Sequence, residues 1–172
     1  MTFWKAFFGA LVAQLLTPGP TVMADALGGW KVKNDADPIE DTRTVVATLA
    51  SEAKDATLTV RCSGKKRTTD VLLTWGKDLG RNYTKITARA DYGEPVMTAW
   101  DIASDPKLAI YTGVTAKGRD LRPAEYAAKL MGMKTLVIRV VPQGESAITS
   151  TFDLTGADKA LAQVAEACRW KE

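Results

Sequence analysis

Cys62 and Cys168 are the two cysteines of this 172-residue chain, and they follow a segment with the pattern of an export leader. Cysteines form lasting disulfides in oxidising compartments outside the cytoplasm. A bond between these two would tie an early part of the exported chain to its last residues. This pair limits the fold more than any other feature, because two segments far apart in sequence must meet.

The leader pattern lies at the N-terminus. Lys5 supplies a short positive region, and residues 6–16 are apolar apart from Gln14. This length suits a signal peptide. A stable membrane helix needs about 20 apolar residues, so the stretch is too short to span a bilayer.

Small residues mark the expected cleavage site. We expect cleavage after Ala26, with Ala24 as the alternative, because after a Pro-Gly-Pro break the segments Val22-Met23-Ala24 and Ala24-Asp25-Ala26 each fit the pattern of a cleavage site. No cysteine stands near either site to carry a lipid. The sequence therefore predicts a signal peptide over 1–26 and a single β-rich periplasmic domain over 27–172, with no stable membrane anchor after cleavage.

Composition limits the possible functions. The formal net charge is +3, from 23 Lys and Arg against 20 Asp and Glu, so nucleic acid is not expected as a partner. Histidine is absent. Triads that use histidine as the base and zinc sites with histidine ligands are therefore excluded. We expect no catalytic set, no cofactor and no metal, and hence a protein that is not an enzyme.

Alternating apolar residues predict many short strands. Clear sets are Val45, Ala47 and Leu49; Leu58, Val60 and Cys62; Val71, Leu73 and Trp75; Ile86, Ala88 and Ala90; Leu136, Ile138 and Val140; and Ile148, Ser150, Phe152 and Leu154. Weaker sets are Val96, Thr98, Trp100 and Ile102, and Leu108 with Ile110. Turn residues separate the sets, as in an antiparallel sheet or sandwich. The predicted fold is mainly β, with about seven to nine short strands.

Two segments show helical spacing instead. Pro123 and Gly132 bracket a short internal helix over 124–131. A C-terminal helix over 157–170 has an apolar face that includes Cys168, and Thr155 is its predicted cap. Cys62 lies on the apolar face of its strand. Both cysteines are therefore expected to point into the core, which supports a disulfide between them.

Candidate chemistry is sparse. Ser51 and Lys54 fit the S-x-x-K spacing of serine–lysine enzymes, but Ser51 follows a strand and the partner motifs of that class are missing. Four acidic residues, Asp35, Asp37, Glu40 and Asp41, gather near the start of the mature chain. They lack the glycine and register of a calcium loop, so a solvated loop is the prediction.

One surface hypothesis concerns Arg89, Asp91 and Trp100, which flank a predicted turn over 91–95. If the three share an exposed surface, they form a binding patch with an aromatic anchor and an ion pair. The alternative is an ordinary surface pair beside a core tryptophan.

The order of several short motifs resembles that of the VasI/TagO-like exported proteins associated with type VI secretion. The motifs are Trp30, residues 37–45, residues 58–62, Thr74-Trp75-Gly76, Arg89-x-Asp91, Trp100-x-x-x-Ser104, residues 136–139, residues 152–156 and Ala167-Cys168-Arg169-Trp170. The resemblance implies a periplasmic, non-enzymatic helper of an envelope assembly, with coupling to peptidoglycan as one option. Cys62 and the Ala167-Cys168-Arg169-Trp170 motif match the two cysteine positions of that family's pattern, so the resemblance also implies a disulfide between them.

Three functions remain open from sequence. The first is an accessory or adaptor protein that binds an envelope or periplasmic protein. The second is an inhibitor of a secreted cell-wall hydrolase, for which the turn over 91–95 is the candidate finger. The third is a hydrolase that uses carboxylates, serine or lysine.

Overall fold

A computed structural model describes residues 27–115 and 121–170. Within them the chain forms nine strands and two helices. The strands are β1 (Lys31–Asp37), β2 (Thr42–Ala50), β3 (Ala56–Ser63), β4 (Thr68–Trp75), β5 (Tyr83–Ala90), β6 (Val96–Ile102), β7 (Leu108–Thr115), β8 (Thr135–Val140) and β9 (Ile148–Asp153). The helices are α1 (Pro123–Leu130) and α2 (Ala157–Cys168). The predicted mainly-β fold with an internal and a C-terminal helix is confirmed.

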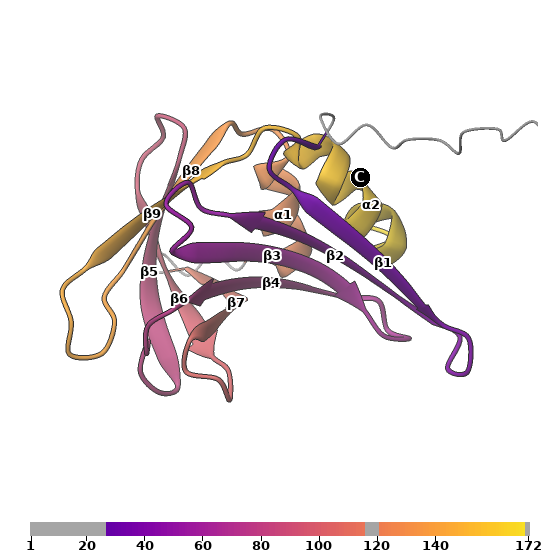
Figure 1. Ribbon diagram of the computed structural model, residues 1–172, viewed down its shortest axis with the longest axis horizontal. Helices are drawn as coiled ribbons and strands as arrows, with labels where there is room; N and C mark the ends of the chain where they lie inside the picture. The colour runs from indigo at the N-terminus through magenta and orange to yellow at the C-terminus, as the bar shows by residue number, and fades with distance from the viewer. Residues whose placement is uncertain (1–26, 116–120, 171–172) are drawn as a thin grey trace, which may run out of the picture.

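All nine strands belong to one antiparallel sheet in the order β1-β2-β3-β4-β7-β6-β5-β8-β9. Strands β1 to β4 form a meander of successive hairpins. The later strands form a second group, which stands steeply against the first (Figure 1). Only three residue pairs, from Leu72–Ile110 to Thr74–Leu108, join β4 to β7. The sheet is therefore strongly bent where the two groups meet.

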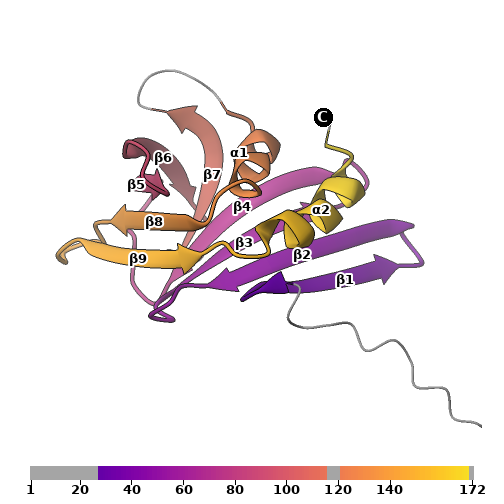
Figure 2. The same cartoon turned by 90° about the horizontal axis from the view of Figure 1, so that it is seen from above.

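Both helices pack against the inner face of the bent sheet. Helix α2 contacts β2 and β3, whereas α1 contacts β4, β7 and α2 (Figure 2). Strands β2 and β3 supply the alternating apolar positions that α2 covers, including Val45, Leu58 and Val60. From α2, Leu161 and Val164 are fully buried. The period-two pattern of these strands and the helical stripe of α2 thus meet in one core.

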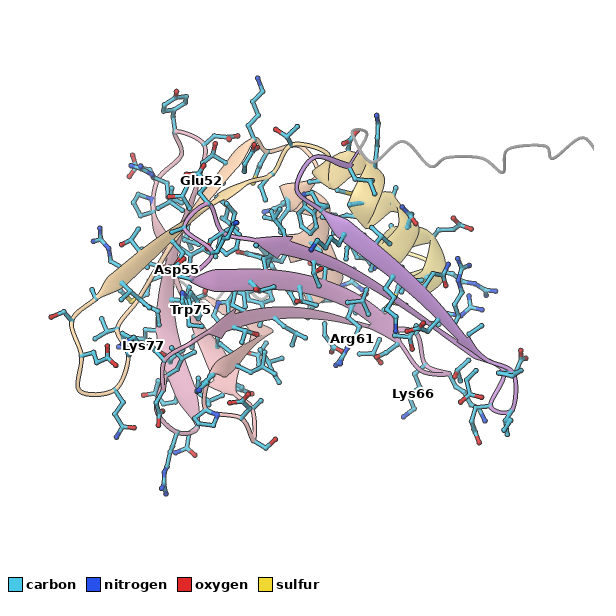
Figure 3. The ribbon with its side chains drawn as sticks, viewed as in Figure 1. Glu52, Asp55, Arg61, Lys66, Trp75 and Lys77 are labelled. Carbon is cyan, nitrogen blue, oxygen red and sulfur yellow. A yellow bond between two sulfur atoms is a disulfide. The ribbon has the colours of Figure 1, made fainter. Side chains whose placement is uncertain are left out.

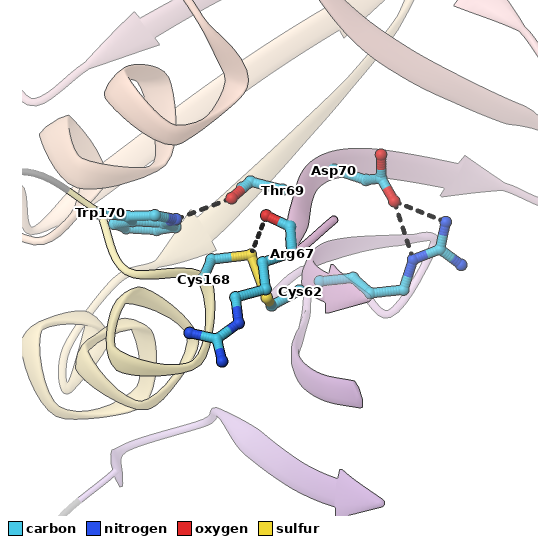
Figure 4. The surroundings of a disulfide bond; sticks show 7 residues. Cys62, Arg67, Thr69, Asp70, Cys168 and Trp170 are labelled. Atoms are coloured by element: carbon cyan, nitrogen blue, oxygen red, sulfur yellow. Dashed lines mark hydrogen bonds and ion pairs between the residues drawn. A yellow bond between two sulfur atoms is a disulfide. The ribbon is translucent and has the colours of Figure 1, made fainter. Parts of the chain in front are cut away.

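The predicted disulfide is present. Cys62 on β3 and Cys168 at the end of α2 are bonded, with their Cα atoms 5.5 Å apart and a sequence separation of 106 (Figure 4). Beyond the bond, the Trp170 indole N–H donates to the Thr69 hydroxyl at 2.7 Å. The C-terminal end is therefore fastened to β3 by a covalent bond and to β4 by a hydrogen bond.

The ends of α2 differ from the prediction. The helix stops at Cys168 because Arg169 adopts a left-handed conformation, with φ of 52°. Its N-cap is Gly156 and not Thr155, whose hydroxyl donates to Asp153 at 2.7 Å. Gly156 has φ of 84°, and a Cβ there would lie 2.5 Å from the carbonyl of Leu27. This position therefore needs glycine.

Strand β1 was not predicted. Its side chains are almost all exposed, and charged residues such as Lys33 and Asp35 form an ion pair along it at 2.6 Å. An edge strand of this kind shows no apolar alternation, and its charges protect the open edge from unwanted pairing. Asp35 and Asp37 therefore belong to a strand, which corrects the prediction of a loop for this part of the acidic cluster.

Candidate functional site

The hypothetical patch of Arg89, Asp91 and Trp100 does not form. Trp100 is fully buried, and its indole N–H donates to the Thr98 hydroxyl at 2.7 Å. It lies on the inner face of β6, whereas Arg89 is exposed on the outer face of β5. No ion pair joins Arg89 to Asp91 in the described part of the chain. The hypothesis was wrong because Trp100 belongs to the core.

Asp91 has a structural role in place of the predicted ion pair. Its carboxylate accepts hydrogen bonds from the backbone N–H groups of Lys134 and Thr135, each at 2.9 Å. The Asp91 N–H in turn donates to the carbonyl of Thr135 at 2.9 Å. These bonds fasten the turn between β5 and β6 to the start of β8.

Ser51 is not a nucleophile paired with Lys54. Its hydroxyl is buried and donates to Asp55 at 2.6 Å, while the N–H of Ala56 donates to it at 3.0 Å. Lys54 is exposed at a turn position with φ of 58°. The S-x-x-K spacing therefore belongs to the turn between β2 and β3, as its context in the sequence indicated.

The acidic cluster also serves local structure. Asp37 accepts hydrogen bonds from the N–H groups of Ile39 and Glu40, which shape the turn between β1 and β2. Glu40 forms an ion pair with Lys65 at 2.9 Å across to the next hairpin. Among residues 27–115 and 121–170, no group of three acidic, cysteine or histidine side chains is arranged to hold a metal ion.

An apolar groove of about 300 Å³ lies between α1 and the hairpin of β5 and β6. This volume is at the lower end of the range for ligand clefts. Its lining comes from β5, β6, β7, α1 and β8 and consists of Ala88, Ala90, Gly93, Glu94, Val96, Thr98, Tyr111, Leu121, Tyr126, Lys129, Leu130, Met133 and Leu136. Of these lining residues, two are charged, Glu94 and Lys129, and most of the others are apolar. Apolar contact therefore dominates the groove.

Stacked aromatic rings form the floor of the groove. The rings of Tyr111 and Tyr126 lie 4.4 Å apart between centroids, and both meet Trp100 edge to face, at 5.2 and 6.1 Å. Such contacts give aromatic side chains fixed orientations. The floor is therefore a rigid surface.

Tyr126 adds no charge to this floor. Burial raises the pKa of the Tyr126 hydroxyl well above its usual range, and the neighbouring Tyr111 raises it further. Tyr126 therefore stays protonated at physiological pH. This arrangement favours apolar binding and gives Tyr126 no role as a base.

The hairpin turn of residues 91–95 overhangs the groove. Gly93 and Glu94 line it, whereas Tyr92 projects fully into solvent. The Gly93 N–H donates to the carbonyl of Ala90 at 2.9 Å, which closes the turn. Together with the bonds of Asp91, this fixes the backbone that presents Tyr92. The groove, Tyr92 and the charged residues Glu94 and Lys129 form the candidate binding site.

Sequence reasoning found part of this site. The turn over 91–95 was predicted as a binding finger, and the internal helix that supplies Tyr126 and Leu130 was predicted over 124–131. The placement of α1 across the groove from β5, β6 and β8 was missed, because it depends on the strand order. A signal was available in Tyr92, a large aromatic residue at a predicted turn, where a core position is not expected.

Neither described helix has the length and apolar content needed to cross a membrane. Protein-family models and curated proteins give no match to this chain. A similar fold occurs in the crystal structure of invasion associated protein B from Bartonella henselae, with a TM-score of 0.51 and 14% sequence identity. The alignment covers 84% of this chain and 96% of that chain. At this identity the likeness shows that the two proteins share a fold.

Proposed function

We propose that the protein is an exported accessory protein that binds a protein of the cell envelope and carries out no catalysis. The observation that carries the proposal is the fixed turn that presents Tyr92 beside an apolar groove. Tyrosine is enriched among residues that dominate protein interfaces. A turn already held in one conformation also loses little entropy when a partner binds.

The groove indicates the chemistry of the partner. A cavity of 150 Å³ lined by apolar side chains accepts one benzene ring, so about 300 Å³ suits roughly two apolar side chains. Glu94 and Lys129 place opposite charges among the lining residues. The partner would therefore present an apolar segment with a basic residue toward Glu94 and an acidic residue toward Lys129. Electrostatic complementarity of this kind fixes the orientation of binding.

Export is supported by two independent features. The N-terminal sequence has the pattern of a leader. The Cys62–Cys168 disulfide suits an oxidising compartment. A role beside type VI secretion in the periplasm is the finer proposal, and it rests on the motif resemblance to VasI/TagO-like proteins.

A second candidate function, inhibition of a secreted cell-wall hydrolase, has one specific observation in its favour. Tyr92 projects from a turn that Asp91 fastens to β8, and such rigid projections suit insertion into an enzyme cleft. Inhibition of the captured hydrolase at an equimolar ratio would select this function over that of an adaptor.

The testing experiment uses the exported, oxidised protein as bait for an envelope extract, with purified sacculi in parallel. The captured protein is identified, purified and titrated against wild type, Tyr92→Ala and Ala88→Phe, which fills the groove. We expect each variant to weaken binding at least tenfold. Ile39→Ala is the matched control, because Ile39 is 91% exposed at another hairpin turn.

Two results would contradict the proposal. One is an unchanged affinity of Tyr92→Ala and Ala88→Phe for the captured protein, which would show that neither the groove nor Tyr92 belongs to the interface. The other is sedimentation with sacculi and no captured protein, which would identify a cell-wall binding module instead. Loss of binding by Ile39→Ala to the same extent would show that the effect is not specific to this site.

A further inference from the structure

The outer face of β5, β6 and β8 carries cations that have no acidic partner. Lys85, Arg89 and Arg139 are exposed, and none forms an ion pair within the described part of the chain. Their side chains point away from α1 and α2, because the alternate residues of these strands, such as Ile86 and Ile138, are buried. This face is distinct from the groove, which opens on the inner side of the same hairpin.

The strand register brings the three cations together. Thr87 pairs with Arg139, so Arg139 lies diagonally between Lys85 and Arg89 on the neighbouring strand. Diagonal neighbours on one face of a sheet are about 7–8 Å apart. Like charges at this spacing repel one another, so this cluster does not serve stability.

The other half of the sheet provides a contrast. On the outer face of β3, Arg61, labelled in Figure 3, is paired with Asp70 of β4 at 2.7 Å, and dashed lines mark the contacts of Asp70 in Figure 4. On the face of β5, β6 and β8, Asp101 and Asp153 form no ion pair with these cations in the described part of the chain. The register places Asp101 opposite Tyr83, and Asp153 opposite Thr135 at the far end of β8. The centre of this face is therefore positively charged.

Exposed apolar side chains lie among the cations. Tyr83, Met97 and Val141 are 59%, 46% and 58% exposed. Together with Arg81, Lys85 and Arg139 they line a shallow hollow of about 810 Å³. Basic residues interspersed with aromatic and aliphatic ones suit the interface of a bilayer, where the cations meet phosphates and the apolar groups enter the headgroup region.

We propose that this face, defined by Arg81, Tyr83, Lys85, Arg89, Met97 and Arg139, binds the surface of an anionic phospholipid bilayer. Charge complementarity identifies the phosphate headgroups as the ligand, and the exposed apolar side chains suit the headgroup region of a bilayer. Binding would be reversible and sensitive to salt, because the cations act at the surface. The groove and Tyr92 remain free on the other face to hold a protein partner.

The test measures co-sedimentation of the exported, oxidised protein with vesicles of phosphatidylglycerol and phosphatidylcholine, compared with pure phosphatidylcholine vesicles. We expect binding to the anionic vesicles at 0.05 M salt that is lost at about 0.5 M, where charges are screened over a few ångströms. The charge-reversal variant Lys85→Glu/Arg139→Glu should bind at least thirtyfold more weakly, because each basic residue at an anionic surface contributes roughly fivefold.

A matched control separates the face from net charge. Lys31→Glu/Lys159→Glu changes the charge by the same amount at exposed positions on β1 and α2, and it should retain more than half of the binding. The N-terminus is read by mass spectrometry, so that a retained apolar leader is not mistaken for the binding face. Thermal melting shows whether each variant is folded. The variant Lys85→Gln/Arg139→Gln removes the two positive charges without adding negative ones, and it should also bind the anionic vesicles more weakly than wild type.

Several results would overturn the proposal. They are equal binding to neutral and anionic vesicles, undiminished binding of folded Lys85→Glu/Arg139→Glu, and an equal loss in the control variant. Capture of an acidic protein through Lys85 and Arg139, without vesicle binding, would assign the face to a protein instead. None of these results depends on the partner of the groove, because the vesicle assay contains this protein alone.

Discussion

Ser150 on β9 donates a hydrogen bond to Asp55, in the turn between β2 and β3, at 2.9 Å, although 95 residues separate the two in sequence. Strand β9 stands at one end of the sheet order, six strands away from β3. The contact is possible because the sheet bends so far that its last strand meets the first hairpins (Figure 3). The Glu52 N–H also donates to the carbonyl of Thr151 at 2.8 Å.

Replacing Asp55 should test how much this junction stabilises the fold. Asp55 accepts from Ser51 and Ser150, and Ser150 accepts from the Trp75 indole at 3.1 Å. Asp55→Ala leaves two buried hydroxyls without their acceptor, so we expect the free energy of unfolding to fall by about 1–3 kcal/mol. Urea unfolding measures it. Asp105→Ala, which removes a local turn contact to the Lys107 N–H, is the control and should change stability less.

Removing the disulfide should have a larger effect. The bond between Cys62 and Cys168 closes a loop of more than 100 residues, and opening such a loop is expected to lower the free energy of unfolding by about 4 kcal/mol. The variant Cys62→Ala/Cys168→Ala is compared with wild type in urea without reductant, and reduced wild type should match the variant. Equal stability of oxidised wild type and variant would contradict a stabilising role.

Asp91 and Tyr92 should separate stability from binding. Asp91→Ala removes the acceptor of two backbone N–H groups, so we expect a loss of about 1–2 kcal/mol in unfolding free energy and faster hydrogen exchange at Lys134 and Thr135. Tyr92→Ala should leave the melting temperature unchanged, because Tyr92 is fully exposed. Equal stability of the two variants would argue against a fixed turn.

Stability should also fall at high pH because of Tyr126. Its pKa is raised in the folded protein, so below pH 10 the hydroxyl is neutral in both the folded and the unfolded chain. Above pH 10 the unfolded chain loses this proton first, and the free energy of unfolding declines by about 1.4 kcal/mol per pH unit from this group. Tyr126→Phe should lack this part of the decline. Parallel pH curves for the two proteins would show that Tyr126 ionises normally.

The parts of the fold that the sequence predicted are those with a buried and an exposed face. Val45 and Leu58 lie in strands with regular alternation, and Leu161 and Val164 share one helical face. Because one face of each element is buried, its apolar residues recur with the period of a strand or a helix. The cysteine pair was found for the same reason. Each cysteine continued the apolar face of its own element.

The failures have an equally local cause. Strand β1 is exposed along nearly its whole length, so burial imposes no alternation on it. Trp100 follows the inner face of β6, yet its exposure could not be decided without knowing that α1 brings Tyr126 to within 6.1 Å of its ring. The strand order and the contacts of α1 depend on residues that are far apart in sequence. The groove depends on both, and the sequence carries no local pattern for them.

The position of the disulfide has a consequence for the order in which this protein matures. Cys62 is synthesised 106 residues before its partner, and α2, which covers β2 and β3, follows all nine described strands in the chain. Until that helix arrives, the apolar side of the first hairpins is open and Cys62 is a free thiol. The core over the first hairpins can close only after α2 has been made, so the first half of the chain needs protection from aggregation and from wrong thiol partners until then.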